Sequence, residues 1–220
     1  MPTQARKRFE GSCSDVKRLL AIHKDIAGDA PGRKYGVEVL SKSAIVLICA
    51  YWEAYIEDIV AEALEFTVAK VVDPAKLPLE LRKIIARMVK QDPNDLTPWN
   101  LAGEGWRSVL KQNLDVALKR YLSNWNTPKS ANIRALYEQA LGLQDLPATW
   151  QRSWLSSTKA IRKLDDFVTL RGAIAHRGKS AQSVKKQVVN NAFAHVQELV
   201  QFTDEATNAH VKSVTGHPLF

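Results

Sequence analysis

Cysteines and long hydrophobic runs are scarce in this sequence, and their scarcity argues against two broad classes of protein. The two cysteines, Cys13 and Cys49, are too few for a disulfide framework, so we expect both to be reduced thiols in a cytoplasmic protein. The strongest apolar run, residues 44–52, is far shorter than the ~20 residues that cross a bilayer. The basic residues at 6–8 are not followed by an apolar stretch, so we expect neither a signal peptide nor a membrane partner.

Several catalytic and cofactor motifs are also missing. The sequence has no Gly-x-Ser-x-Gly, no phosphate-cradling glycine loop and no dinucleotide fingerprint. Four histidines show no paired ligand spacing with cysteine or aspartate: His23, His195, His210 and His217. We therefore expect no metal site and no cofactor.

Helical periodicity is what the chain does contain. With 220 residues and 45% hydrophobic content, it can bury a full core as one domain. Strand-like alternation never extends beyond a few residues, so the fold class predicted is an all-α bundle. Helices are predicted over about 14–27, 37–72, 79–91, 106–122, 131–141, 156–178 and from Ser180 or Ser183 to 212. Residues 1–13 are predicted to form a basic, loosely ordered tail, and residues 92–105 a loop.

The helix predicted over 156–178 contains a conflict between charge and position. At about 100° per residue, its apolar half comprises Ile161, Leu164, Phe167, Val168, Leu170, Ile174 and Ala175. Arg171 lies near the middle of that half, whereas His176 lies about 140° away around the helix. A permanently charged guanidinium on a core-facing stripe is unfavourable unless it is paired or solvated. Conflicts of this kind tend to mark functional or strained sites.

Two acids in the helix predicted over 37–72 are candidate partners for Arg171. Glu53 and Glu57 interrupt an apolar face with alternating three- and four-residue spacing. We expect Arg171 to be largely buried and paired with one of these glutamates, because each charge would otherwise lack a partner. Judged from the helical wheel alone, a buried ion pair without any chemistry is the simpler interpretation.

Arg171 and His176 also match a known motif, in which four residues separate an arginine from a histidine at the end of a late helix. Together with residues 50–58, 126–128 and 214–216, this motif resembles the RiboL-PSP-type branch of HEPN-domain proteins. The resemblance implies a HEPN-like helical bundle with an additional helical insertion at about 92–152. It also implies a metal-independent endoribonuclease that acts as a homodimer, leaves 2′,3′-cyclic phosphate ends on RNA, and has a defence or toxin-like role.

The resemblance implies catalytic roles for both residues of the motif. His176 would transfer a proton at the ribose 2′-OH, since histidine titrates near neutrality. Arg171, supported by the two glutamates, would stabilise the developing phosphorane with its permanent charge. Arg177 and Lys179 would hold flanking phosphates, although as charges at a helix C-terminus they could equally complement the macrodipole. The net charge of +8 favours a polyanion such as RNA, and a generic basic surface is the alternative.

One position departs from the family pattern. The family usually places Asn, Asp or His directly after the arginine, whereas this chain has Gly172. This departure supports a competing interpretation, a non-catalytic HEPN module that dimerises or binds a partner protein or a nucleotide. Gly172 also leaves the surface beside His176 bare, so that a phosphate or a second helix could approach closely. An antitoxin is the partner expected under the toxin-like interpretation.

The six tryptophans are expected to serve mainly in the core and in helix packing. Trp99 and Trp106 are the exceptions, because they lie in or beside a segment rich in glycine and proline. We therefore retain these two as candidates for stacking on bases.

Overall fold

The computed structural model describes residues 2–28, 36–123, 125, 127–177 and 184–220, without the side chains of residues 176 and 177. Within these residues the chain forms seven α-helices and no β-strand, which confirms the predicted all-α class. The α-helices are α1 (Gln4–Ala27), α2 (Glu38–Lys70), α3 (Leu79–Gln91), α4 (Gly105–Leu122), α5 (Ser130–Leu141), α6 (Ser157–Arg177) and α7 (Lys186–Thr215). Three short 3-10 helices, η1 (Pro74–Lys76), η2 (Thr97–Leu101) and η3 (Leu146–Thr149), lie between them.

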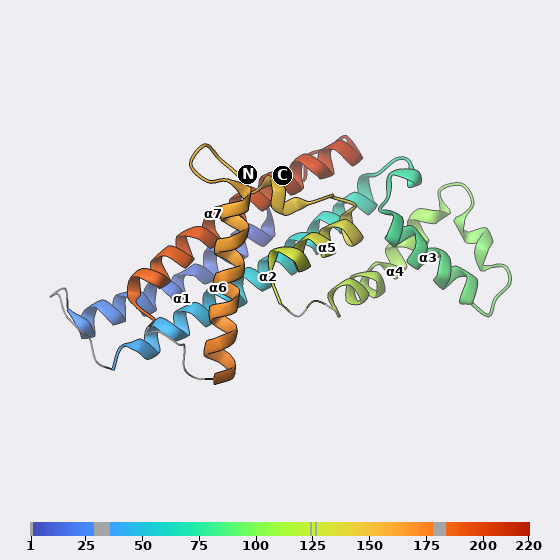
Figure 1. Cartoon of the computed structure of the whole chain (residues 1–220). Helices are drawn as coiled ribbons and strands as arrows, with labels where there is room; N and C mark the ends of the chain where they lie inside the picture. The colour runs from blue at the N-terminus through green and yellow to red at the C-terminus, as the bar shows by residue number, and fades with distance from the viewer. Residues whose placement is uncertain (1, 29–35, 124, 126, 178–183) are drawn as a thin grey trace.

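Helix α2 is the centre of the bundle, and it contacts α1, α4, α5, α6 and α7 (Figure 1). Its middle is apolar almost all round, which is typical of a helix that is covered on every side. Trp52 and Tyr55 are buried within it, and both find partners for their polar atoms. Trp52 donates to the carbonyl of Pro128 at 3.2 Å, and Tyr55 donates to the carbonyl of Val200 at 3.0 Å. These bonds satisfy the indole N–H and the phenol hydroxyl, which would be costly to bury without a hydrogen-bond partner.

Helix α1 corrects the prediction of a loosely ordered tail at residues 1–13. The helix begins at Gln4, and Ala5, Phe9 and Cys13 are buried in the core. Thr3 caps it by accepting a hydrogen bond from the backbone N–H of Arg6 at 3.1 Å. The basic residues that suggested a tail lie on the solvent side of this helix. The prediction was wrong because it relied on the basic composition of residues 1–13. The four-residue spacing of Ala5, Phe9 and Cys13, which continues the apolar side of the helix, is the better indicator.

Helices α3 and α4 pack on each other at one end of the elongated molecule, remote from α6, and α5 returns along α2 (Figure 1). The predicted bounds of α3 match those observed, and the loop predicted over 92–105 contains η2. Residues 92–152 therefore carry α4, α5 and two 3-10 turns. That this segment is an insertion relative to the family that the sequence resembles stays a prediction.

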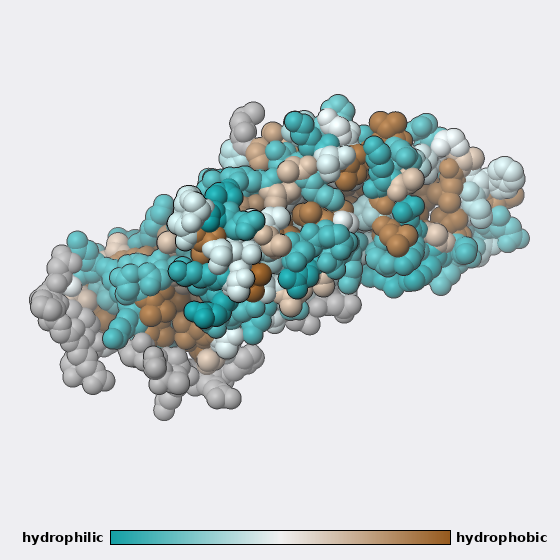
Figure 2. All heavy atoms as spheres, turned by 45° about the horizontal axis from the view of Figure 1, so that its top comes forward, coloured by the Kyte–Doolittle hydropathy of each residue, from teal (hydrophilic) through white to brown (hydrophobic). Residues whose placement is uncertain are grey.

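The remaining helix ends differ by a few residues from the predictions. Helix α6 runs from Ser157 to Arg177, and α7 extends to Thr215 rather than ending near residue 212. Ser180 and Ser183, the predicted start of the last helix, lie outside the described residues. Figure 2 shows hydrophilic residues over most of one face, with apolar residues in scattered patches. None of the described helices is both long enough and apolar enough to cross a membrane.

Candidate functional site

The candidate site is built on α6, which α2, α5 and α7 hold in place. Leu164, Val168 and Ile174 are buried and form the core-facing side of the helix. Asp165 anchors its middle by accepting hydrogen bonds from the backbone N–H and the hydroxyl of Ser130, at 2.9 and 2.8 Å. The backbone N–H of Ser130, at the start of α5, is thus capped by a carboxylate from another helix. The position of α6 is therefore fixed on two sides.

Arg171 reaches back from α6 to α2, where its Nη2 atom lies 3.9 Å from Oε2 of Glu53. The predicted pairing with Glu53 is present, and the side chain of Arg171, predicted to be largely buried, is partly exposed. The side chain of Arg171 is 30% exposed, and that of Glu53 is 24% exposed. The Nε atom of Arg171 is buried and has no hydrogen-bond partner among the described residues. The Nε atom is thus enclosed, while part of the Arg171 side chain remains exposed.

The pKa of Glu53 depends more on its burial than on its attraction to Arg171. Burial raises the pKa of Glu53, and the positive charge of Arg171 lowers it by less. The buried thiol of Cys49 lies within the field of the same pair, and burial raises its pKa to about 11 despite Arg171. A thiol with so high a pKa is protonated near neutral pH and is a poor nucleophile. Cys49 therefore belongs to the packing of the site rather than to any chemistry there.

Glu57, the other predicted partner, does not pair with Arg171 in the described structure. It lies one helical turn beyond Glu53, and its pKa is raised first by burial and then by the charges of Glu53 and Asp58. Both effects disfavour its ionised form. The arrangement thus selects Glu53 as the support of the guanidinium.

Gly172 lies beside Arg171 and leaves an open surface on α6. A Cβ atom added at Gly172 would meet no other heavy atom within 4 Å, so the space is empty within one protomer. The backbone of His176 and Arg177 is helical, whereas their side chains, together with the whole of Lys179, lie outside the described residues. Helical geometry places positions 171 and 176 about 140° apart around α6. A single copy of this helix therefore presents the two positions in different directions.

The two tryptophans proposed for base stacking differ in exposure. Trp106 is buried, and the guanidinium of Arg107 lies 4.4 Å from its ring centroid. Trp99 is 75% exposed on η2, in the part of the molecule remote from α6. Only Trp99 of this pair thus presents its ring to solvent.

Two residues of the site escaped prediction from the sequence. Cys49 lies four residues before Glu53 on α2, a spacing that places the two side chains next to each other on the helix surface. Asp165 has no local signal, because its partner Ser130 is thirty-five residues away in the chain. No group of three or more His, Cys, Asp or Glu side chains in the described part of the chain is arranged to hold a metal ion.

Comparison with known proteins identifies the family. A family model described as RiboL-PSP-HEPN matches residues 12–209, which is most of the chain and includes both α2 and α6. No curated protein and no solved structure gives a significant match. The helical fold agrees with the matched family, whose domain is helical. The chain belongs to the RiboL-PSP-HEPN family.

Proposed function

We propose that this protein is a metal-independent endoribonuclease in which Arg171 and His176 act together across a homodimer. The observation that carries the proposal is the side chain of Arg171, paired with Glu53 and 30% exposed, on the same helix as His176. Membership of the HEPN family supports a role in RNA cleavage or in nucleotide chemistry. The net charge of +8 is suited to a polyanionic substrate.

The chemistry needs a proton shuttle and a fixed positive charge. His176 removes the proton of a ribose 2′-OH, and the 2′-oxygen attacks the adjacent phosphorus. Arg171 stabilises the charge that develops on the phosphorane oxygens. The bond from phosphorus to the 5′-oxygen breaks and a protonated His176 gives a proton to that oxygen, so the products are a 2′,3′-cyclic phosphate and a 5′-hydroxyl. Arg177 and Lys179, next along the chain, are suited to hold flanking phosphates.

A second copy of the chain is part of the proposal because Arg171 and His176 diverge around one helix. Two α6 helices related by a two-fold axis would place the arginine of one protomer near the histidine of the other. The empty space at Gly172 supports this arrangement, since it lets another helix approach the backbone closely. We expect the Gly172–Ala175 surface to lie in the dimer interface. Light scattering that shows a monomer at high concentration would contradict this expectation.

The competing function is a non-catalytic HEPN module that dimerises or binds a partner protein or a nucleotide. Gly172 favours it, because the polar side chain that the family usually has beside the arginine is missing here. Without that side chain, the imidazole of His176 has one fewer neighbour to orient it. A biological role as a toxin held in check by an antitoxin belongs to the catalytic proposal alone, and toxicity on expression would favour it.

The decisive experiment incubates the purified protein with a broad panel of RNAs, with and without EDTA. Under the catalytic proposal, cleavage survives EDTA, leaves 2′,3′-cyclic phosphate ends and is lost in His176→Ala. Undiminished cleavage by His176→Ala would refute the mechanism. A well-folded protein that cuts none of the RNAs would instead favour the binding module.

A further inference from the structure

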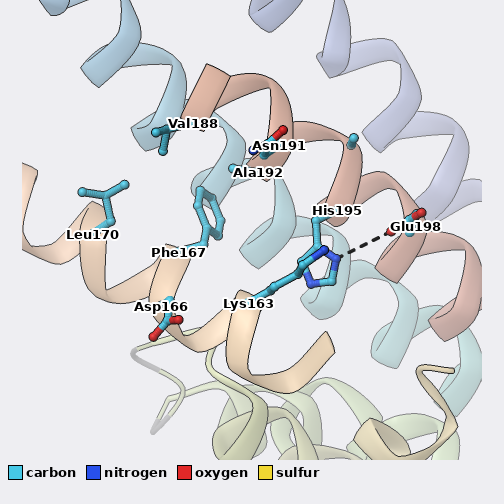
Figure 3. Close-up of a pocket in the computed structure, with 10 residues that line it drawn as sticks. Lys163, Asp166, Phe167, Leu170, Val188, Asn191, Ala192, His195 and Glu198 are labelled. Carbon is cyan, nitrogen blue, oxygen red and sulfur yellow. Dashed lines mark ion pairs between the residues drawn. The ribbon is translucent and has the colours of Figure 1, made fainter. Parts of the chain in front are cut away.

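A groove of about 580 Å³ lies between α6 and α7, apart from the pair formed by Arg171 and Glu53. This volume is within the usual range for small-molecule sites. At one end of the groove Leu170 and Val188 form an apolar mouth, and Phe167 projects into the space between the helices (Figure 3). Ala192 faces Phe167 from α7, and its small side chain helps to leave the space open. This part of the groove can take an aliphatic chain or an aromatic ring.

His195 marks the polar end of the groove, and its hydrogen bonding is incomplete. The side chain is only 5% exposed, and Nε2 lies 3.1 Å from the carbonyl oxygen of Ala160. Because a carbonyl oxygen only accepts, Nε2 carries the hydrogen, and Nδ1 of the neutral ring is left as an acceptor. Burial is the main cause of the lowered pKa of His195, which favours this neutral form. Nδ1 is buried and has no hydrogen-bond partner among the described residues.

Glu198 brings a second acceptor to the same place. Its Oε2 atom lies 3.7 Å from Nδ1 of His195 (Figure 3), which is an ion pair when the imidazole is protonated but is beyond hydrogen-bonding distance for the neutral ring. Two acceptors that face each other without a proton between them need a donor from elsewhere. Glu198 is 41% exposed, so its side chain can turn toward an incoming group. Asp166 adds a second carboxylate to the lining, and Lys163 adds one ammonium, whose positive charge contributes to the lowered pKa of His195.

We propose that this groove binds a small organic amine, with its ammonium group between His195 and Glu198 and its apolar part over Phe167. A primary ammonium offers three donors, which matches a neutral imidazole acceptor and a carboxylate at once. The apolar part of the ligand covers the exposed edge of the groove at Leu170 and Val188. Leu170 directly precedes Arg171 on α6, so a ligand in the groove would lie next to the candidate site. The proposal does not rest on RNA cleavage.

The test is calorimetric titration of the full chain with hexylamine and phenethylamine at neutral pH, with hexan-1-ol and hexanoate as matched ligands. We expect the amines to bind about tenfold or more tightly than either matched ligand, because charge-assisted hydrogen bonds are lost in both. Lengthening the alkyl chain should strengthen binding by up to about fourfold per methylene. Equal affinity for hexan-1-ol would overturn the ammonium site. Tighter binding of hexanoate would overturn it too, because it would show that Lys163 makes the groove a site for anions. Absence of binding by both amines would also overturn the proposal.

Two variants locate the site, and a third controls for charge. Glu198→Gln should weaken amine binding by about tenfold or more, and Ala192→Leu should weaken it by filling the groove. Glu205→Gln removes the same charge from α7 outside the groove, so it should leave the affinity unchanged. Thermal unfolding checks that Ala192→Leu is folded, and Glu198→Gln suffices if it is not. Amine affinity that is unaffected by Glu198→Gln would refute the proposed position of the ammonium.

Discussion

Replacing Arg171 with alanine should separate a catalytic role from a structural one. Removing one partner of a buried ion pair costs the protein about 3–5 kcal/mol, and this is the loss expected for a largely buried Arg171. In the structure the two charged groups are 3.9 Å apart and both are partly exposed. Burial also raises the pKa of Glu53 by more than Arg171 lowers it, so the attraction does not repay the desolvation. We therefore expect Arg171→Ala to lower the free energy of unfolding by about 1 kcal/mol at most.

The same substitution should have a much larger effect on catalysis. Removing one group that stabilises developing charge typically lowers kcat by about 10²–10³-fold. Urea denaturation measures the first effect, and cleavage of a fluorogenic RNA measures the second. Arg162→Ala is the matched control, because Arg162 is an exposed arginine on the same helix. A stability loss above about 3 kcal/mol would refute the argument from partial exposure, and cleavage equal to the control would refute the catalytic role.

Three further predictions concern the interface, the N-terminus and pH. Gly172→Ala should stabilise the protomer by about 0.5–1 kcal/mol, because glycine is unfavourable within a helix and the added Cβ meets nothing. The same substitution should weaken the proposed dimer, and if sedimentation shows no weakening, Gly172 is not at a close contact between protomers. Thr3→Ala should cost about 1–3 kcal/mol in urea denaturation, since it removes a helix cap and the hydroxyl that donates to buried Asp204; Thr3→Ser keeps both groups, and an equal loss there would contradict the explanation. Burial lowers the pKa of His195 in the folded state, although the charge of Glu198 opposes this shift. The contribution of His195 to stability is therefore present above 6.5, the pKa of histidine in the unfolded chain, and is lost as the pH falls through the folded-state pKa. The wild type should thus lose more stability than His195→Gln between pH 7.5 and pH 5, and parallel pH profiles would argue against a neutral buried imidazole.

The sequence by itself was sufficient for the features that depend on nearby residues. The apolar periodicity of α2 and α6, the ends of α3 and the positions of Arg171 and His176 on one helix all follow from spacings of three and four residues. These features are local, because neighbours on a helix surface are neighbours in the chain. The family pattern could be recognised for the same reason, since its residues are defined by their spacing.

Tertiary structure alone decided which distant groups meet. Glu53 and Glu57 lie on the same face of α2, about 6 Å apart along its axis, so the helical wheel cannot choose between them as partners of Arg171. The choice depends on how far α6 is shifted along α2, and packing sets that shift. The bond between Thr3 and Asp204 joins residues 201 positions apart, and it fastens the start of α1 to α7. The degree of burial of Arg171 was likewise undetermined in the sequence, because it depends on how closely two helices approach at one point.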